Sequence, residues 1–66
     1  MMHLIAEIKQ RRHTLNVTQE QLAEISGVGL RTLKQFESGK GNPTLITICK
    51  LADALGLTLK LEVKKP

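Results

Sequence analysis

The spacing of two short amphipathic segments constrains the fold of this 66-residue chain more than any other feature. Thr18 to Gln21 has the pattern of a capping box, in which the Thr18 hydroxyl accepts from the Gln21 backbone N–H and the Gln21 side chain accepts from the Thr18 N–H. Gly27 is expected to end that helix after about two turns, and only residues 27–29 precede the next helically periodic stretch, 30–37. The sequence therefore predicts two helices joined by a tight turn.

A further helix is expected on each side of this pair. The first covers residues 3–15 and ends at Asn16, which can take the left-handed conformation. The last begins after Asn42-Pro43-Thr44 and ends at Gly56. Apolar positions at helical spacing give each helix an inner stripe. The expected core residues are Leu4, Ile5, Ile8 and Leu15; Leu22, Ala23 and Ile25; Leu33 and Phe36; and Leu45, Ile48, Cys49, Ala52 and Leu55.

The hydrophobic period changes from about 3.6 to 2 at Leu57, which is the pattern of a strand. The chain offers no second strand candidate, so this strand would leave its backbone groups unpaired. A 66-residue chain is also close to the size at which one core barely offsets conformational entropy, and the single Cys49 has no intrachain disulfide partner. We therefore expect a homodimer in which the strands of two copies pair across a two-fold axis as an antiparallel ribbon. The expected interface residues are Leu57, Leu59, Leu61 and Val63.

Composition and charge restrict the class of function. The formal charge of +4 and the pI of about 9.7 favour an anionic partner, and the basic excess is spread over the chain rather than gathered in a tail. No apolar run reaches the ~20 residues of a membrane span and the N-terminus lacks a secretory signal pattern, so we expect a cytoplasmic protein. His3, His13 and Cys49 have no partners at catalytic or metal-ligand spacing. We therefore expect no enzymatic activity and no metal or other cofactor.

Residues 18–37, together with the loop that follows them, resemble the helix-turn-helix of the Cro and cI phage-repressor family, also called the Xre family. The resemblance covers roughly residues 4–56. It implies a mostly α, four-to-five-helix repressor-like domain over residues 1–56, with residues 57–66 as the C-terminal dimerisation strand of the same single domain. The features that coincide are Thr18-Gln19, Leu22-Ala23, Gly27, Leu33, Phe36-Glu37, Ser38-Gly39-Lys40 and Leu51-Ala52-Asp53-Ala54-Leu55-Gly56.

The resemblance implies that residues 29–37 form the helix that reads the major groove, which at about 12 Å wide admits one α-helix. Arg31 would bind O6 and N7 of guanine, and Gln35 would bind N6 and N7 of adenine. Leu30 departs from the usual polar residue, and it either contacts a thymine methyl group or belongs to the core. Gly29 replaces the usual serine or threonine cap, which weakens the helix start and a phosphate contact.

The resemblance also implies contacts to the DNA backbone. Gln19, at the start of the preceding helix, would bind a phosphate with the support of the helix N-terminus. Lys34 and Lys40 would contact phosphates, and Asn42 lies in a loop that touches the backbone in this family. The alternative for each of these side chains, and for Arg31 and Gln35, is a hydrated surface position.

Arg12 and Glu37 have a structural role in the same comparison. Arg12 lies on the apolar stripe of the first helix, and Glu37 follows Phe36 in the third. The matching positions of the family form a partly buried ion pair, so we expect this pair to hold the two helices together.

The C-terminal strand resembles that of the HipB-like antitoxins, which dimerise through it, bind operator DNA and hold a HipA-like kinase toxin. That resemblance implies a homodimeric, repressor-type regulator of an inverted-repeat operator, with a HipA-like kinase toxin as a second partner. Two alternatives stay open: a phage or mobile-element repressor without a toxin, and an antitoxin that mainly binds protein. The neighbouring gene would distinguish them, since an antitoxin should copurify with a kinase-like neighbour.

Overall fold

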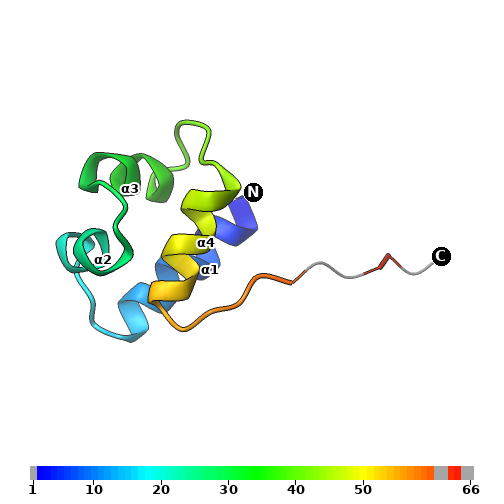
Figure 1. The fold of residues 1–66 in the computed structure, drawn as a ribbon, viewed down its shortest axis with the longest axis horizontal. Helices are drawn as coiled ribbons and strands as arrows, with labels where there is room; N and C mark the ends of the chain where they lie inside the picture. The colour runs from blue at the N-terminus through cyan, green and yellow to red at the C-terminus, as the bar shows by residue number, and fades with distance from the viewer. Residues whose placement is uncertain (1, 61–62, 65–66) are drawn as a thin grey trace.

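The computed structural model of the chain describes residues 2–60 and 63–64, and this part of the chain contains four α-helices. They are α1 (Met2–Thr14), α2 (Gln19–Ser26), α3 (Leu30–Glu37) and α4 (Leu45–Ala54). The α2 helix packs against both α3 and α4, and α1 packs against α3 (Figure 1). The mostly α architecture is therefore confirmed, and each helix lies within one or two residues of its predicted range. None of the described helices is long and apolar enough to cross a lipid bilayer.

The helix ends form where the sequence predicts them. The capping box at the start of α2 is complete, with 3.0 Å from the Gln21 backbone N to Thr18 Oγ1 and 2.8 Å from the Thr18 N to Gln21 Oε1. Asn16 has a φ of 56° and, as predicted, ends α1 in the left-handed conformation. Its N–H donates to His13 O and the next N–H donates to Arg12 O, which together form a Schellman motif.

The capping box gives a first testable prediction. Thr18→Ala removes the side-chain acceptor for the Gln21 N–H, so we expect a loss of about 1 kcal/mol in the free energy of unfolding and a fall of about 4–8 °C in the melting temperature. Circular dichroism melts would measure it. Thr18→Ser keeps the hydroxyl and should melt with the parent protein, and an unchanged melt for the alanine variant would contradict the assigned cap.

The core lies where the four helices meet. Leu22, Leu33 and Phe36 are fully buried at its centre. Two core members were absent from the sequence prediction: Val28, in the turn between α2 and α3, and Leu51 in α4. The full set of buried apolar residues is Ile5, Ile8, Leu22, Val28, Leu33, Phe36, Ile48, Leu51, Ala52 and Leu55.

Four predicted core positions are wrong. In α4 the buried stripe runs through Ile48, Leu51, Ala52 and Leu55, so Leu45 and Cys49 lie on an adjacent side of the helix and are exposed. Ile25 is 60% exposed because α2 buries the side of Leu22 instead, and Leu15 is exposed because α1 ends at Thr14.

The chain after α4 turns back at Gly56, whose φ is 74°. The Leu57 N–H donates to Ala52 O over 2.8 Å, and the segment then leaves the helical body (Figure 1). Among the described residues 57–60 and 63–64 no strand is present. The predicted strand pairs with a second chain, so this single chain does not test it, and Leu61 lies outside the described residues.

Candidate nucleic-acid interface

A short, well-anchored turn sets the position of α3 relative to α2. Gly27 has a φ of 76° with open space around its α-carbon, so glycine is needed there for backbone conformation rather than for lack of room. The next residue, Val28, is buried in the core, and its N–H donates to Ser26 Oγ over 3.2 Å. Gly29 caps α3 without a side-chain hydrogen bond, as the sequence predicts. The turn therefore fixes α3 by one buried side chain and local hydrogen bonds.

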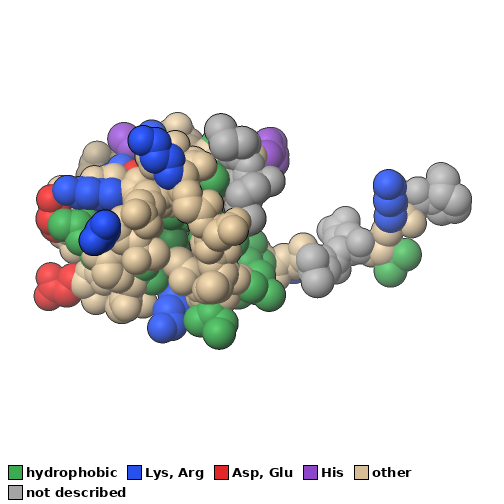
Figure 2. Space-filling model, turned by 90° about the horizontal axis from the view of Figure 1, so that it is seen from above, with side chains coloured by type: hydrophobic (Ala, Val, Ile, Leu, Met, Phe, Trp, Pro, Cys, Tyr) green, Lys and Arg blue, Asp and Glu red, His purple; other side chains and the backbone are tan. Residues whose placement is uncertain are grey.

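The α3 helix has one buried and one exposed side. Leu33, Phe36 and Glu37 face the protein, while Arg31 and Gln35 lie on the opposite, exposed side. Lys34 is exposed beside them, and no ion pair joins it or Arg31 to another described residue. Figure 2 looks down on the α3 side of the molecule, where basic side chains stand out and acidic ones lie toward one margin.

Two further α3 residues bear on this exposed side. Leu30 is half-buried at its edge and is not part of the hydrophobic core of the described residues, so its contact with a thymine methyl group stays a prediction. Thr32 is exposed at the other edge and was missed from the sequence. Helical geometry could have found it, since Thr32 lies three positions before Gln35 and therefore on the same side of the helix.

The loop after α3 brings three predicted contact residues together. The backbone carbonyl of Gln35 accepts from the Lys40 N–H over 3.0 Å, which folds the loop back over the end of α3. The Gln35 side chain lies beside Gly41, where an added β-carbon would be 3.8 Å from Gln35 Oε1. Thr32, Gln35, Lys40 and Asn42 contribute to the lining of one shallow hollow of about 60 Å³. Hydroxyl, amide and ammonium groups are thus gathered at the C-terminal end of α3.

A buried ion pair joins α1 to α3. Arg12 Nε lies 2.6 Å from Glu37 Oε2, and Arg12 Nη2 lies 2.8 Å from Glu37 Oε1, so both carboxylate oxygens are engaged. The two residues are 8% and 7% exposed. Arg12 Nη1 also donates to Val17 O over 2.8 Å, just before α2. This is the pair that the family resemblance implies, and it ties α1, α3 and the approach to α2 together.

Gln19 connects this ion pair to the predicted DNA-binding side. Its Nε2 donates to Glu37 Oε1 over 3.0 Å, and the residue is half-buried at the first position of α2. An amide group carries two N–H donors, so the bond to Glu37 orients the side chain and leaves one donor. From the sequence, Gln19 is expected only to contact a phosphate, and this second bond was missed.

The ion pair changes the acidity of Glu37. Burial alone would raise the pKa of its carboxyl group, but the hydrogen bonds from Arg12 and Gln19 and the positive charge of Arg12 outweigh it and hold the pKa below its ordinary value. The hydrogen bond to Glu37 likewise raises the pKa of Arg12. Glu37 is therefore a carboxylate, and Arg12 a cation, throughout the neutral range.

This lowered pKa predicts acid sensitivity. The carboxylate contributes fully to stability above the ordinary Glu pKa of 4.5, and its contribution is lost as the pH falls through the lower folded-state pKa. We expect the melting temperature to drop below about pH 4.5, and Glu37→Gln to weaken this dependence. Melts between about pH 7 and pH 3 would measure it. Glu24→Gln, at an exposed position of α2, is the matched control, and a parallel pH profile for Glu37→Gln would contradict the assignment.

The described residues contain no group of three or more histidine, cysteine, aspartate or glutamate side chains that could hold a metal ion. What this surface offers is hydrogen-bond donors and positive charge on one side of an anchored helix. Such groups suit the base edges and phosphates of double-stranded DNA.

Comparison with known proteins agrees with this geometry. Residues 8–61 match the helix-turn-helix family model. The chain is 36% identical over 58 residues to the cryptic phage CTXphi transcriptional repressor RstR of Vibrio cholerae, which covers 88% of this chain and 52% of that protein. It is 40% identical over 58 residues to an uncharacterized HTH-type transcriptional regulator of Haemophilus influenzae, covering 88% and 59%. It is 43% identical over 49 residues to another from Methanothermobacter thermautotrophicus, covering 74% and 71%.

The chain spans between about half and three fifths of the length of the first two of these relatives. No solved structure matches it.

Proposed function

The chain belongs to the Cro/cI-type helix-turn-helix family, and from this premise we propose that it is a repressor-type transcriptional regulator that binds an inverted-repeat operator as a homodimer. The observation that carries the proposal is the exposed side of α3. Arg31, Lys34 and Gln35 are exposed there, and neither basic side chain forms an ion pair with a described residue. Leu33 and Phe36 anchor the helix in the core. A surface of this kind fits the major groove, which admits one helix.

Direct base reading is assigned to two side chains. The guanidinium group of Arg31 matches the O6 and N7 acceptors of guanine, and the amide of Gln35 matches N6 and N7 of adenine. Leu30, at the edge of the same side, would contact a thymine methyl group. Gly29, which carries no side chain, allows the start of α3 to approach the DNA closely.

Backbone positioning is assigned to the residues around this side. The second N–H of Gln19 Nε2 would donate to a phosphate oxygen while the first stays bonded to Glu37. Lys34, Lys40 and Asn42 supply further donors, two of them beside the hollow at the end of α3. These contacts would fix how deeply α3 enters the groove.

The homodimer would place two copies of α3 in successive major grooves. Pairing of residues 57–64 across a two-fold axis, through Leu57, Leu59, Leu61 and Val63, would set a distance of about 34 Å between them, or a multiple of it. The dimer would carry twice the charge of the chain, which is +4 per copy. This geometry calls for an operator with two inverted half-sites.

One observation favours a repressor over an antitoxin. The phage repressor RstR, to which the chain is similar, is described as a transcriptional repressor. This favours a repressor of phage or mobile-element type without a toxin over an antitoxin that holds a HipA-like kinase. Copurification with a kinase-like product of the neighbouring gene would reverse the preference.

A gel-shift titration on the region upstream of its own gene tests the proposal. We expect a shifted complex that contains two copies of the chain. An unrelated DNA fragment of equal length should compete only weakly for the protein. Because Lys34 and Lys40 of both copies neutralise phosphates, the logarithm of the binding constant should fall with the logarithm of salt concentration with a slope of about −4. No shift at low salt on any palindromic fragment from this region would contradict the proposal.

A further inference from the structure

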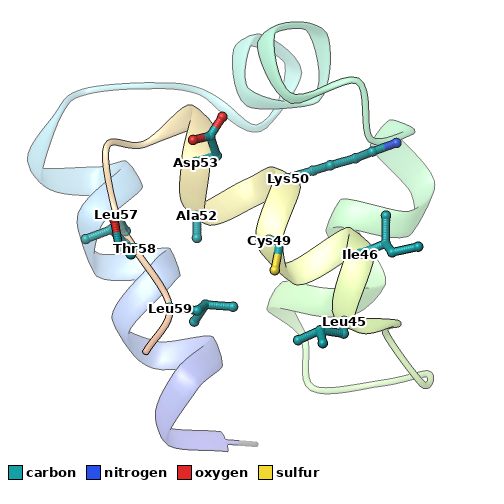
Figure 3. Close-up of a pocket in the computed structure, with 9 residues that line it drawn as sticks. All are labelled: Leu45, Ile46, Cys49, Lys50, Ala52, Asp53, Leu57, Thr58 and Leu59. Atoms are coloured by element: carbon teal, nitrogen blue, oxygen red, sulfur yellow. The ribbon is translucent and has the colours of Figure 1, made fainter. Parts of the chain in front are cut away.

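An apolar groove lies between α4 and the segment that follows it. Its volume is about 610 Å³. Leu45 and Leu59 point toward each other across it, and the sulfur of Cys49 lies between them (Figure 3). The charged lining residues Lys50 and Asp53 point away from its middle. The groove thus lacks the converging polar groups with which a protein orients a small ligand, and its chemistry suits an apolar segment of protein.

The same chain carries exposed apolar side chains on both parts of this region. Leu45 and Ile46 are each 69% exposed on α4, and Val63, on the C-terminal segment, is 94% exposed. Figure 2 shows hydrophobic side chains gathered where the C-terminal segment leaves the body. Clustered exposed apolar surface marks a site of association, and a chain this short gains stability by burying it.

We propose that the groove receives the C-terminal segment of a second copy of this chain, with Val63 of that copy packed against Leu45 and Cys49. The inference rests on the homodimer of the proposed function and deepens it, because it adds α4 to the interface. Each copy would supply one groove and one C-terminal segment.

The direction of the C-terminal segment supports this occupant. Residues 57–59 run antiparallel to α4 and form one wall of the groove (Figure 3). In Figure 1 the segment then continues away from the helical body. An extended chain places Val63 about 13 Å beyond Leu59, which is too far to fill the groove of its own copy.

Antiparallel pairing brings the second copy's segment to the required place. In an antiparallel pair the residue numbers of facing positions add up to a constant, so a two-fold axis at position 61 would set Val63 of one copy opposite Leu59 of the other. Leu59 borders the groove and points toward Leu45 (Figure 3). Alternation puts positions 59 and 63 on one side of a strand, so Val63 would point toward α4, as Leu59 does (Figure 3).

The reciprocal contact also limits the assembly to two copies. Because the contact between groove and segment occurs twice about one two-fold axis, the groove and the segment of each copy are both occupied, and neither is left for a third chain. A dimer rather than a fibre is the expected product.

Substitution of the two partners tests the inference in the full-length chain. Leu45→Asp in the groove and Val63→Asp on the segment should each raise the dimer dissociation constant about 100-fold, since each change occurs twice in the dimer. Sedimentation equilibrium would measure it. Leu45 is exposed at the start of α4, where aspartate is favourable for a helix. The Leu45→Asp monomer should therefore stay folded, with the melting temperature of the parent monomer. Ile25→Asp, exposed on α2, is the matched control and should leave the dimer unchanged.

A cross-link identifies the occupant directly. The Val63→Cys variant should form a disulfide with the native Cys49 of the other copy under mild oxidation, giving a dimer on a non-reducing gel, because the two α-carbons would lie within about 7 Å. Peptide mapping would identify the bond between Cys49 and the introduced cysteine. A cross-link within one chain, or only between the two introduced cysteines, would overturn the inference.

The result also separates this inference from the proposed function. A stable dimer that binds the operator and is unaffected by Leu45→Asp would overturn the groove as an interface while leaving the regulator proposal intact. A chain that is monomeric at every concentration and shifts no palindromic DNA would contradict both.

Discussion

Arg12→Ala should lower the melting temperature by about 12–24 °C, because removing one partner of a buried ion pair costs about 3 kcal/mol in a domain of this size. The guanidinium group is bonded to both oxygens of Glu37 and to Val17 O. Its loss leaves a buried carboxylate with Gln19 as its remaining hydrogen-bond donor. A domain of 66 residues has a total stability of only about 3–10 kcal/mol, so a substantial fraction of the protein should be unfolded at 37 °C.

The neighbouring arginine provides the control. Arg11 donates to Leu55 O over 2.9 Å but forms no ion pair with a described residue, so Arg11→Ala should cost less than Arg12→Ala. The double variant Arg12→Ala/Glu37→Ala should be more stable than the sum of the single changes predicts, since it removes both charges of the pair. Thermal melts of the parent and these variants measure this coupling. An Arg12→Ala melt within about 3 °C of the parent would rule out the structural role.

The helix boundaries could be predicted from the sequence because local chemistry determines them. The side chains of Thr18 and Gln21 each accept a hydrogen bond from the backbone N–H of the other residue, within one turn. Asn16 and Gly56 take left-handed conformations that end their helices. These features involve residues close in the sequence, so no knowledge of the tertiary structure is required.

The exposure of particular side chains was harder to predict because it depends on distant partners. Leu45 lies three positions before the buried Ile48, and Cys49 lies three positions before the buried Ala52. This helix has more apolar positions than it buries, and the contacts of α4 select the stripe through Leu51. Val28 was missed because a single apolar residue in a tight turn has no periodicity, although its burial is what anchors the turn.

The candidate site also combines features that local sequence determines with features that depend on distant contacts. The exposed side of α3 follows from helical spacing once Leu33 and Phe36 are known to be inside. The bond from Gln19 to Glu37 joins residues 18 positions apart, and no local pattern indicates it. Family resemblance supplied the phosphate role of Gln19, whereas only the folded structure shows its link to the ion pair.

Arg31→Ala should weaken operator binding about 30- to 25,000-fold while leaving the fold intact, because a bidentate arginine–guanine contact contributes about 1–3 kcal/mol of discrimination and a homodimer loses it in both half-sites. Arg31 is exposed and forms no ion pair with a described residue, so its removal should not change the melting temperature. Fluorescence anisotropy titrations on the operator, on a scrambled fragment and on single-base variants would measure both affinity and specificity.

The pattern of the loss distinguishes base reading from simple charge attraction. Arg31→Ala should weaken operator binding far more than binding to the scrambled fragment and should relax the preference at one guanine in each half-site. Arg31→Lys keeps the charge but cannot make the bidentate contact. It should therefore recover non-specific affinity without recovering the preference for guanine. Lys34→Ala, as the matched control on the same helix, should weaken both DNAs alike and reduce the salt slope by about 2, one for each copy. If Arg31→Ala behaves as Lys34→Ala does, then Arg31 contacts phosphate, and the reading of bases must lie with Gln35 and the neighbouring edge residues of α3.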